Sequence, residues 1–356
     1  MSVELQLNKP ARMEWLDAMR GFTMILVVAH HVSTDCFGQD IKQSAALSFL
    51  VLFRMPLFFF VSGFLAYSSK VEWTLRTLGQ NLLKKCKVQL IPTVVFLAVF
   101  LSLMRPDFMK GLEAALASPT KSGYWFTWAL LLMFIIYYIF AYLESKLPKK
   151  TLIPILLLWT GATVVYATIY MPSWFTYHKD PFFSYTSLIQ VMTYFHFFLF
   201  GTIVRRYWQY VERLFDTKWF YTIVVILAFI CAVDYLKWHT LRLQWANLPR
   251  TLAMYSLILI VVMFFRHYKD WFTKKTIVGK CLQYIGTRTL DVYLLHFLFL
   301  PNAKMIGTFF SENRRNFAFD ITLSVIVGLL VIGFCLITSN ILRVSPIFRK
   351  YLFGRP

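Results

Sequence analysis

Long, mostly uncharged windows of 17 to 25 residues recur from one end of this 356-residue chain to the other. At about 1.5 Å per helical residue, each window can cross a hydrocarbon core of about 30 Å. Backbone groups inside a bilayer must bond to one another, so these windows are expected to be helices. The sequence therefore predicts an all-α, polytopic integral membrane protein with about ten transmembrane helices. The predicted spans are 16–34, 44–69, 88–104, 123–143, 151–170, 184–204, 219–236, 249–265, 287–309 and 318–342.

The composition leaves little room for a soluble domain. Hydrophobic residues make up 58% of the chain and its mean hydropathy is +0.58, which is more apolar surface than one soluble core hides. No internal repeat or low-complexity linker divides the sequence, so residues 1–356 are expected to form a single transmembrane domain. The first span contains Asp17 and Arg20 and lacks a small-residue cleavage site, which favours a retained helix over a signal peptide.

The net charge of +20 is distributed between the spans rather than along one basic domain, which argues against a nucleic-acid partner. If the N-terminus is cytoplasmic, 25 Lys and Arg residues fall on the side of the termini, 11 on the other side, and Arg54 inside a span. The excess predicts that both termini are cytoplasmic. The five cysteines are scattered and odd in number, so neither a metal site nor a disulfide framework is expected.

The first span carries polar and charged side chains, which are unfavourable in lipid. A charged side chain near the bilayer centre costs at least about 2.5 kcal/mol. Arg20 and His31 are eleven residues apart, so at about 100° per residue they share a helical face with Asp17, whereas His30 points elsewhere. His31 also lies roughly 16 Å further along the helix than Arg20, an arrangement that suits an elongated anionic ligand. Asp35, four residues after His31, is placed to orient its ring. The same pattern also fits a packed histidine bonded to a neighbouring helix.

Arg54 lies near the middle of the second span, close to Pro56 and Gly63. Pro56 removes a helix hydrogen bond and Gly63 permits close approach, so this helix is predicted to bend beside a cavity. Arg54 suits binding of a phosphate or a developing oxyanion, and it equally suits pairing with a carboxylate such as Asp291.

Two further groups of polar residues are candidates. Thr289, Tyr293 and His296 form one stripe of the ninth span, which fits interhelical hydrogen bonding as well as catalysis. Lys84, Lys85 and Lys87 precede the third span. They suit the phosphates of a nucleotide-containing donor, and they also fit an ordinary cytoplasmic positive cluster.

These stretches, in this order, resemble the acyltransferase family 3 membrane proteins over almost the whole chain. The residues that carry the resemblance are Leu16 to Gly21 with His31, Met55 to Phe64, Trp125 and Phe126 with Leu130, Phe198 to Gly201, and Thr289 to His296. One departure concerns the start of the third helix, where the family commonly has two arginines three residues apart. Lys84 and Lys87 keep the charge there but lose the bidentate fork.

The resemblance implies about ten helices in a bacterial cytoplasmic (inner) membrane and an acyl-CoA donor, usually acetyl-CoA. It also implies O-acylation of a sugar, a lipid-linked glycan or another cell-envelope acceptor. Some members carry a fused extracytoplasmic hydrolase-like domain, for which this chain has no room. A separate envelope-assembly partner is then an alternative to transfer within the bundle.

The resulting hypothesis places the CoA nucleotide near Arg20 and the lysine cluster, with the thioester directed toward His31 as general base. Arg54, with Tyr293 or Ser62, is expected to stabilise the oxyanion, and Asp35 and His296 complete the catalytic candidates. An acyl-histidine intermediate is the other route. Alternatives are an amine or small-molecule acceptor, a longer or dicarboxylic acyl group, and a transporter. The last is disfavoured because inverted repeats and paired broken helices are missing from the sequence.

Overall fold

The computed structural model describes residues 13–40, 44–148, 151–169, 181–233, 248–312 and 317–353, and every regular element within these ranges is helical. Short π or 3-10 turns occur at Val32–Cys36, Lys121–Gly123 and Lys269–Phe272. The α-helices are α1 (Glu14–His31), α2 (Ala45–Ala66), α3 (Leu75–Met104), α4 (Phe108–Ala117), α5 (Trp125–Glu144), α6 (Ile153–Ile169), α7 (Pro181–Thr186), α8 (Leu188–Arg206), α9 (Trp208–Phe215), α10 (Lys218–Val233), α11 (Leu248–His267), α12 (Ile277–Thr287), α13 (Thr289–Phe299), α14 (Lys304–Glu312), α15 (Phe317–Leu342) and α16 (Pro346–Phe353).

Six of the described helices are long and apolar enough to cross a membrane, namely α2, α3, α5, α8, α11 and α15. A seventh crossing results if α9 and α10, which meet at 85°, are counted as one broken span. The predicted all-α membrane architecture is therefore confirmed, whereas the count of ten stays a prediction. The cytoplasmic side of both termini also stays a prediction, and residues 1–12 and 354–356 lie outside the described residues.

The ninth predicted span is wrong as one continuous helix over 287–309. Helix α12 ends at Thr287, α13 occupies only Thr289–Phe299, and α14 begins at Lys304. Pro301 explains the second break because it lacks a backbone N–H and disfavours helical dihedrals at the preceding residue. Leu300 is accordingly extended, with φ −68° and ψ 117°.

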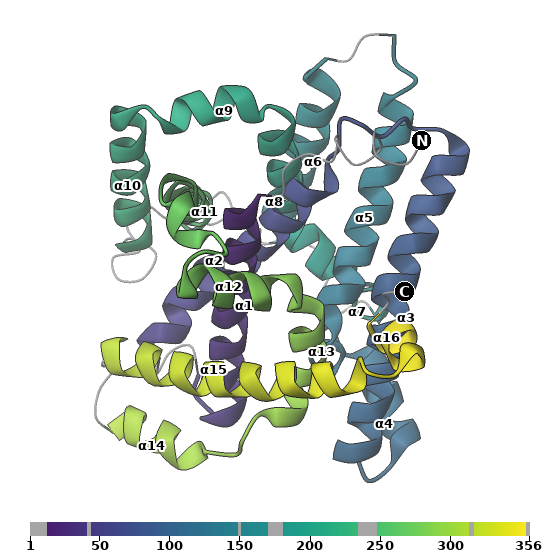
Figure 1. Ribbon diagram of the computed structural model, residues 1–356, viewed down its shortest axis with the longest axis vertical. Helices are drawn as coiled ribbons and strands as arrows, with labels where there is room; N and C mark the ends of the chain where they lie inside the picture. Colours follow the sequence, from purple (N-terminus) through teal and green to yellow (C-terminus); the bar gives the residue numbers. More distant parts are fainter. Residues whose placement is uncertain are drawn as a thin grey trace.

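Helix α1 occupies the centre of the bundle, between the α3–α5 pair and the α10–α11 pair (Figure 1). Its tightest contact is with α12, through two facing glycines. A Cβ on Gly21 would lie 2.0 Å from the Leu282 carbonyl oxygen, and one on Gly286 would lie 1.8 Å from that of Asp17. Only glycine permits this backbone approach. The contact places α13, which follows directly, against the polar face of α1.

A second glycine pair joins α2 to α8. A Cβ on Gly63 would lie 1.8 Å from the Phe198 carbonyl oxygen, and one on Gly201 would lie 2.0 Å from that of Phe60. The close approach predicted at Gly63 is therefore confirmed, and its partner is another backbone. Because α2 is anchored in this way, Arg54 has a fixed position about two and a half turns before Gly63 on the same helix.

Candidate active site

His31 is the last residue of α1 and precedes a π-helical turn over Val32–Cys36. The wider turn brings the Asp35 carboxylate within 2.9 Å of His31 Nδ1, so the contact expected from their spacing is present. Because a carboxylate only accepts, Nδ1 carries the hydrogen and Nε2 keeps its lone pair. The His31 side chain is 18% exposed and that of Asp35 is 50% exposed. His31 thus has the orientation and the open nitrogen that a general base needs.

Three adjoining cavities follow the length of α1. We name them the Arg20 cavity, of about 210 Å³, the Arg54 cavity, of about 40 Å³, and the Ser122 cavity, of about 570 Å³. Phe58, Phe126 and Tyr293 line both the Arg20 and the Arg54 cavity. His31 and Trp125 line both the Arg54 and the Ser122 cavity. His31 therefore lies where the path from one end of α1 meets the cavity at its other end.

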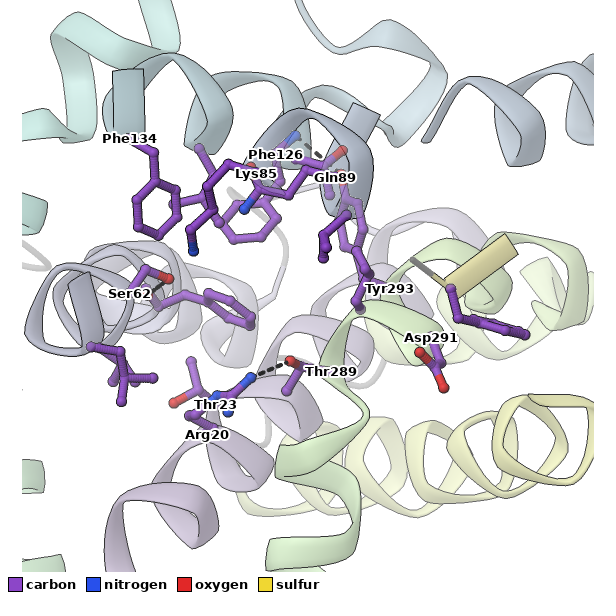
Figure 2. A pocket seen from close by; sticks show the side chains of 18 residues that line it. Arg20, Thr23, Ser62, Lys85, Gln89, Phe126, Phe134, Thr289, Asp291 and Tyr293 are labelled. Atoms are coloured by element: carbon purple, nitrogen blue, oxygen red, sulfur yellow. Dashed lines mark hydrogen bonds between the residues drawn. The ribbon is translucent and has the colours of Figure 1, made fainter. Parts of the chain in front are cut away.

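The Arg20 cavity contains the cations at the N-terminal end of α1 (Figure 2). Arg20 donates to Thr289 Oγ1 at 3.1 Å and to Asp17 at 3.3 Å. Lys85 reaches in from α3, with its ammonium 3.5 Å from the centre of the Phe134 ring. Of the three lysines singled out from the sequence, only Lys85 lines this cavity, whereas Lys84 and Lys87 are exposed.

Arg54 lines the small cavity between the other two. Its Nε is buried without a hydrogen-bond partner among the described residues. The pairing with Asp291 that the sequence left open is not formed, because the Asp291 carboxylate binds Arg343 Nη2 at 2.6 Å and Ser339 Oγ at 2.6 Å. Arg54 forms no ion pair with a carboxylate in the part of the chain that the structure describes, so its charge is suited to stabilise negative charge that appears during a reaction.

The Tyr293 hydroxyl is expected from the sequence to donate to the oxyanion, but it has other partners in the structure. The hydroxyl donates to the Gly123 carbonyl oxygen at 2.6 Å and accepts from the Phe126 N–H at 3.1 Å. Its proton is therefore committed to the backbone of the turn that precedes α5. Ser62 is committed in the same way, because its hydroxyl donates to the Phe58 carbonyl oxygen at 2.9 Å.

His296 lies beside His31, with the two ring centroids 5.0 Å apart. Its Nδ1 is 2.8 Å from the Tyr293 carbonyl oxygen, so Nδ1 carries the hydrogen. Nε2 is buried without a partner among the described residues, and His296 lines none of the three cavities. His296 therefore packs against the His31 ring without lining these cavities, and its catalytic role stays a prediction.

Several lining residues were not predicted as site residues from the sequence. Phe58, Phe126 and Trp125 form the walls between the cavities, although their aromatic runs resemble ordinary lipid-facing segments. The turn that includes Ser122 and Gly123 lines the largest cavity. Its one sequence signal is the Lys-Ser-Gly series ahead of an apolar run, which is typical of any loop.

The family comparison covers nearly all of these residues. The acyltransferase family 3 model, described as an acyltransferase domain, matches residues 13–340. No curated protein and no solved structure gives a significant match. The matched range contains His31, Arg54, Lys85 and the whole of α13. The chain therefore belongs to acyltransferase family 3, and it is an acyltransferase built into a bundle of membrane-spanning helices.

Proposed function

We propose that the protein transfers an acetyl group from acetyl-CoA to a hydroxyl of a cell-envelope glycan or its precursor, with His31 as general base. The observation that carries this proposal is the position of His31. It is oriented by Asp35 and lies between a cavity with cationic side chains and a larger cavity at the other end of α1. A transferase needs such a junction, because its two substrates must meet at one base.

The donor enters at the Arg20 cavity. Arg20 and Lys85 supply positive charge that complements the CoA phosphates at the mouth, and the aromatic walls suit the alkyl segments of the pantetheine arm. The thioester carbonyl then lies in the Arg54 cavity, beside the guanidinium. The acceptor approaches from the Ser122 cavity, so the two substrates reach His31 from opposite sides.

In the proposed reaction, His31 is the one residue that carries the proton from the acceptor hydroxyl to the CoA sulfur. The acceptor oxygen attacks the thioester carbon while His31 Nε2 takes the hydroxyl proton, and Asp35 stabilises the resulting imidazolium. Arg54 stabilises the negative charge on the carbonyl oxygen. The carbon–sulfur bond then breaks, and the CoA sulfur receives the proton from His31. Positioned general-base catalysis of this kind contributes about 10² to 10⁴ in rate.

The volume of the Arg54 cavity favours a small acyl group. A water-sized group needs about 10 to 15 Å³ of cavity volume, so a cavity of about 40 Å³ takes roughly three such groups. The methyl, carbon and oxygen of an acetyl group match that number. Longer or dicarboxylic acyl groups would require the walls formed by Val27, Met55 and Phe58 to move.

The test compares purified wild-type protein with His31→Ala and His30→Ala, using radiolabelled acetyl-CoA and membranes that supply the glycan acceptors. We measure acetyl-CoA consumption and label retained on glycans. His31→Ala is expected to lower transfer by about 10² to 10⁴. His30→Ala is the matched control, because His30 is adjacent and buried but lines none of the three cavities.

Label transferred by wild type and by His30→Ala, but not by His31→Ala, supports the proposal. Equal losses in the two variants would contradict the role of His31. Consumption without label on any glycan would contradict the acceptor class. Faster turnover with succinyl-CoA or butyryl-CoA than with acetyl-CoA would contradict the acyl group.

A further inference from the structure

The wall of the Ser122 cavity contains an unusual backbone segment. Lys121, Ser122 and Gly123 all have positive φ angles, of 49°, 51° and 97°. Side chains other than glycine rarely adopt this left-handed conformation, and consecutive examples are strained. The strained turn lies beside His31, since Ser122 and Gly123 line the same cavity as His31 and Asp35.

Lys121 fixes the turn from one side. Its side chain is turned inward and the residue is only 3% exposed. The ammonium donates to the carbonyl oxygens of Leu116, at the end of α4, and of Ser184 in α7, at 2.5 and 2.7 Å. Burying a lysine ammonium against backbone carbonyls costs solvation free energy, so the residue contributes more than solubility. It ties the turn to two other helices.

Helix α13 fixes the turn from the other side. Tyr293 donates to the Gly123 carbonyl oxygen and accepts from the Phe126 N–H, so one hydroxyl joins the turn to the first turn of α5. The Phe297 ring packs directly on Gly123, where a Cβ would lie 2.2 Å from the ring. Gln190 of α8 adds a hydrogen bond to the Pro119 carbonyl oxygen at 2.6 Å. The strained conformation is thus maintained from several helices at once.

We propose that the Lys121–Gly123 turn positions the acceptor hydroxyl at His31. The Lys121 ammonium and the Tyr293 hydroxyl lock this turn as positioning groups, and neither group touches a substrate. The inference rests on the proposed function, because it assigns the Ser122 cavity to the acceptor. It makes the turn, through the Ser122 hydroxyl, the element that holds an acceptor rich in hydroxyl groups.

This role predicts a specific kinetic signature. A loosened turn misplaces the acceptor but leaves the Arg20 cavity unchanged, because Lys121 lies at the opposite end of α1 from the donor cations. The transfer rate at saturating acetyl-CoA should fall, while the KM for acetyl-CoA stays constant. A general loss of packing would alter both quantities and the amount of folded protein.

The experiment measures glycan labelling and free acetate from radiolabelled acetyl-CoA in washed membranes containing the full chain, with His31→Ala membranes as background. The variants are Lys121→Met, which keeps the stem and removes the ammonium, and Lys121→Arg, which keeps the charge and donors. Tyr293→Phe keeps the ring and removes the hydroxyl. Lys110→Met, at an exposed lysine of neighbouring α4, is the matched control.

We expect Lys121→Met and Tyr293→Phe to lower glycan labelling about tenfold with the KM for acetyl-CoA changed less than about twofold. Lys121→Arg should recover labelling to within about threefold of wild type. Unchanged labelling in both Lys121→Met and Tyr293→Phe, or a rise in KM for acetyl-CoA equal to the loss of rate, overturns the inference. If Lys121→Met does not accumulate, the same comparison of glycan labelling and KM for acetyl-CoA is made with Tyr293→Phe and Ser122→Ala. Unchanged labelling in both of these variants overturns the inference. Absence of all acetyl transfer by wild type would instead contradict the proposed function.

Discussion

The two ends of the site are built in different ways. At the Arg20 end, the polar groups are long cationic side chains on continuous helices, with Arg20 on α1 and Lys85 on α3. At the Ser122 end, Asp35 and Arg105 share the cavity wall with a short turn. The backbone of this turn is strained, and its hydrogen-bond partners come from α4, α7, α8 and α13.

This difference corresponds to the chemistry of the two proposed substrates. A nucleotide with several phosphates is recognised through charge, which tolerates small changes in side-chain position. A neutral hydroxyl must be aligned with a base within a fraction of an ångström, which requires a rigid wall. Charge is therefore expected to control donor affinity at one end, and rigidity to control the transfer step at the other.

The largest effect beyond the His31 test should occur where the two ends meet. Replacing Arg54 with Gln removes the charge that faces the thioester carbonyl, so kcat should fall by about 10² to 10³. Arg54→Lys keeps a positive charge but lacks the planar guanidinium, so its kcat should fall less than that of Arg54→Gln. Steady-state kinetics with acetyl-CoA measures kcat and KM separately. A rise in KM for acetyl-CoA at unchanged kcat would place Arg54 with the donor-binding cations instead.

A smaller effect should distinguish Lys85 from its neighbours. Lys85→Met keeps the stem on the Phe134 ring and removes the ammonium from the Arg20 cavity, so the KM for acetyl-CoA should rise about tenfold. Lys84→Met, one residue earlier and exposed, should change it by less than about twofold. Equal shifts in the two variants would mean that the lysines act as a diffuse positive cluster rather than through one site.

The smallest effect concerns the acyl group. Val27 lines the Arg54 cavity, and Val27→Ala removes two methyl groups from its wall. Butyryl-CoA turnover relative to acetyl-CoA should then rise about fivefold, since one methylene in an apolar pocket changes selectivity modestly. Competition assays with mixed thioesters measure the ratio. A ratio that stays at the wild-type value would show that this cavity does not select the acyl chain.

Much of the donor half could be predicted from helical periodicity. The eleven-residue spacing places Arg20 and His31 on one face of a helix, and the four-residue spacing brings Asp35 to His31 Nδ1. The lysine cluster shows the limit of this method. A helix turns by about 100° per residue, so Lys85 faces the cavity while Lys84 and Lys87 do not, and the sequence alone does not tell which face is inward.

Arg54 and Tyr293 show what periodicity misses. Whether Arg54 is paired with Asp291 depends on Arg343, which directly follows α15 and binds Asp291. Whether the Tyr293 hydroxyl is available depends on the Gly123 carbonyl, 170 residues away in the chain. No local pattern contains these partners.

The sequence by itself determined that this chain is a helical membrane protein of acyltransferase family 3 and that His31 has a carboxylate partner. The helical membrane character and the Asp35 contact follow from hydropathy over a bilayer's thickness and from side-chain spacing over a few turns, whereas the family follows from the order of the motifs along the chain. The tertiary structure decided which lysine reaches the cavity, which carboxylate Arg343 binds and how the Lys121–Gly123 turn is locked. Those contacts arise only when distant helices pack, because a hydrogen bond or ion pair depends on the position of both partners and not on either segment alone.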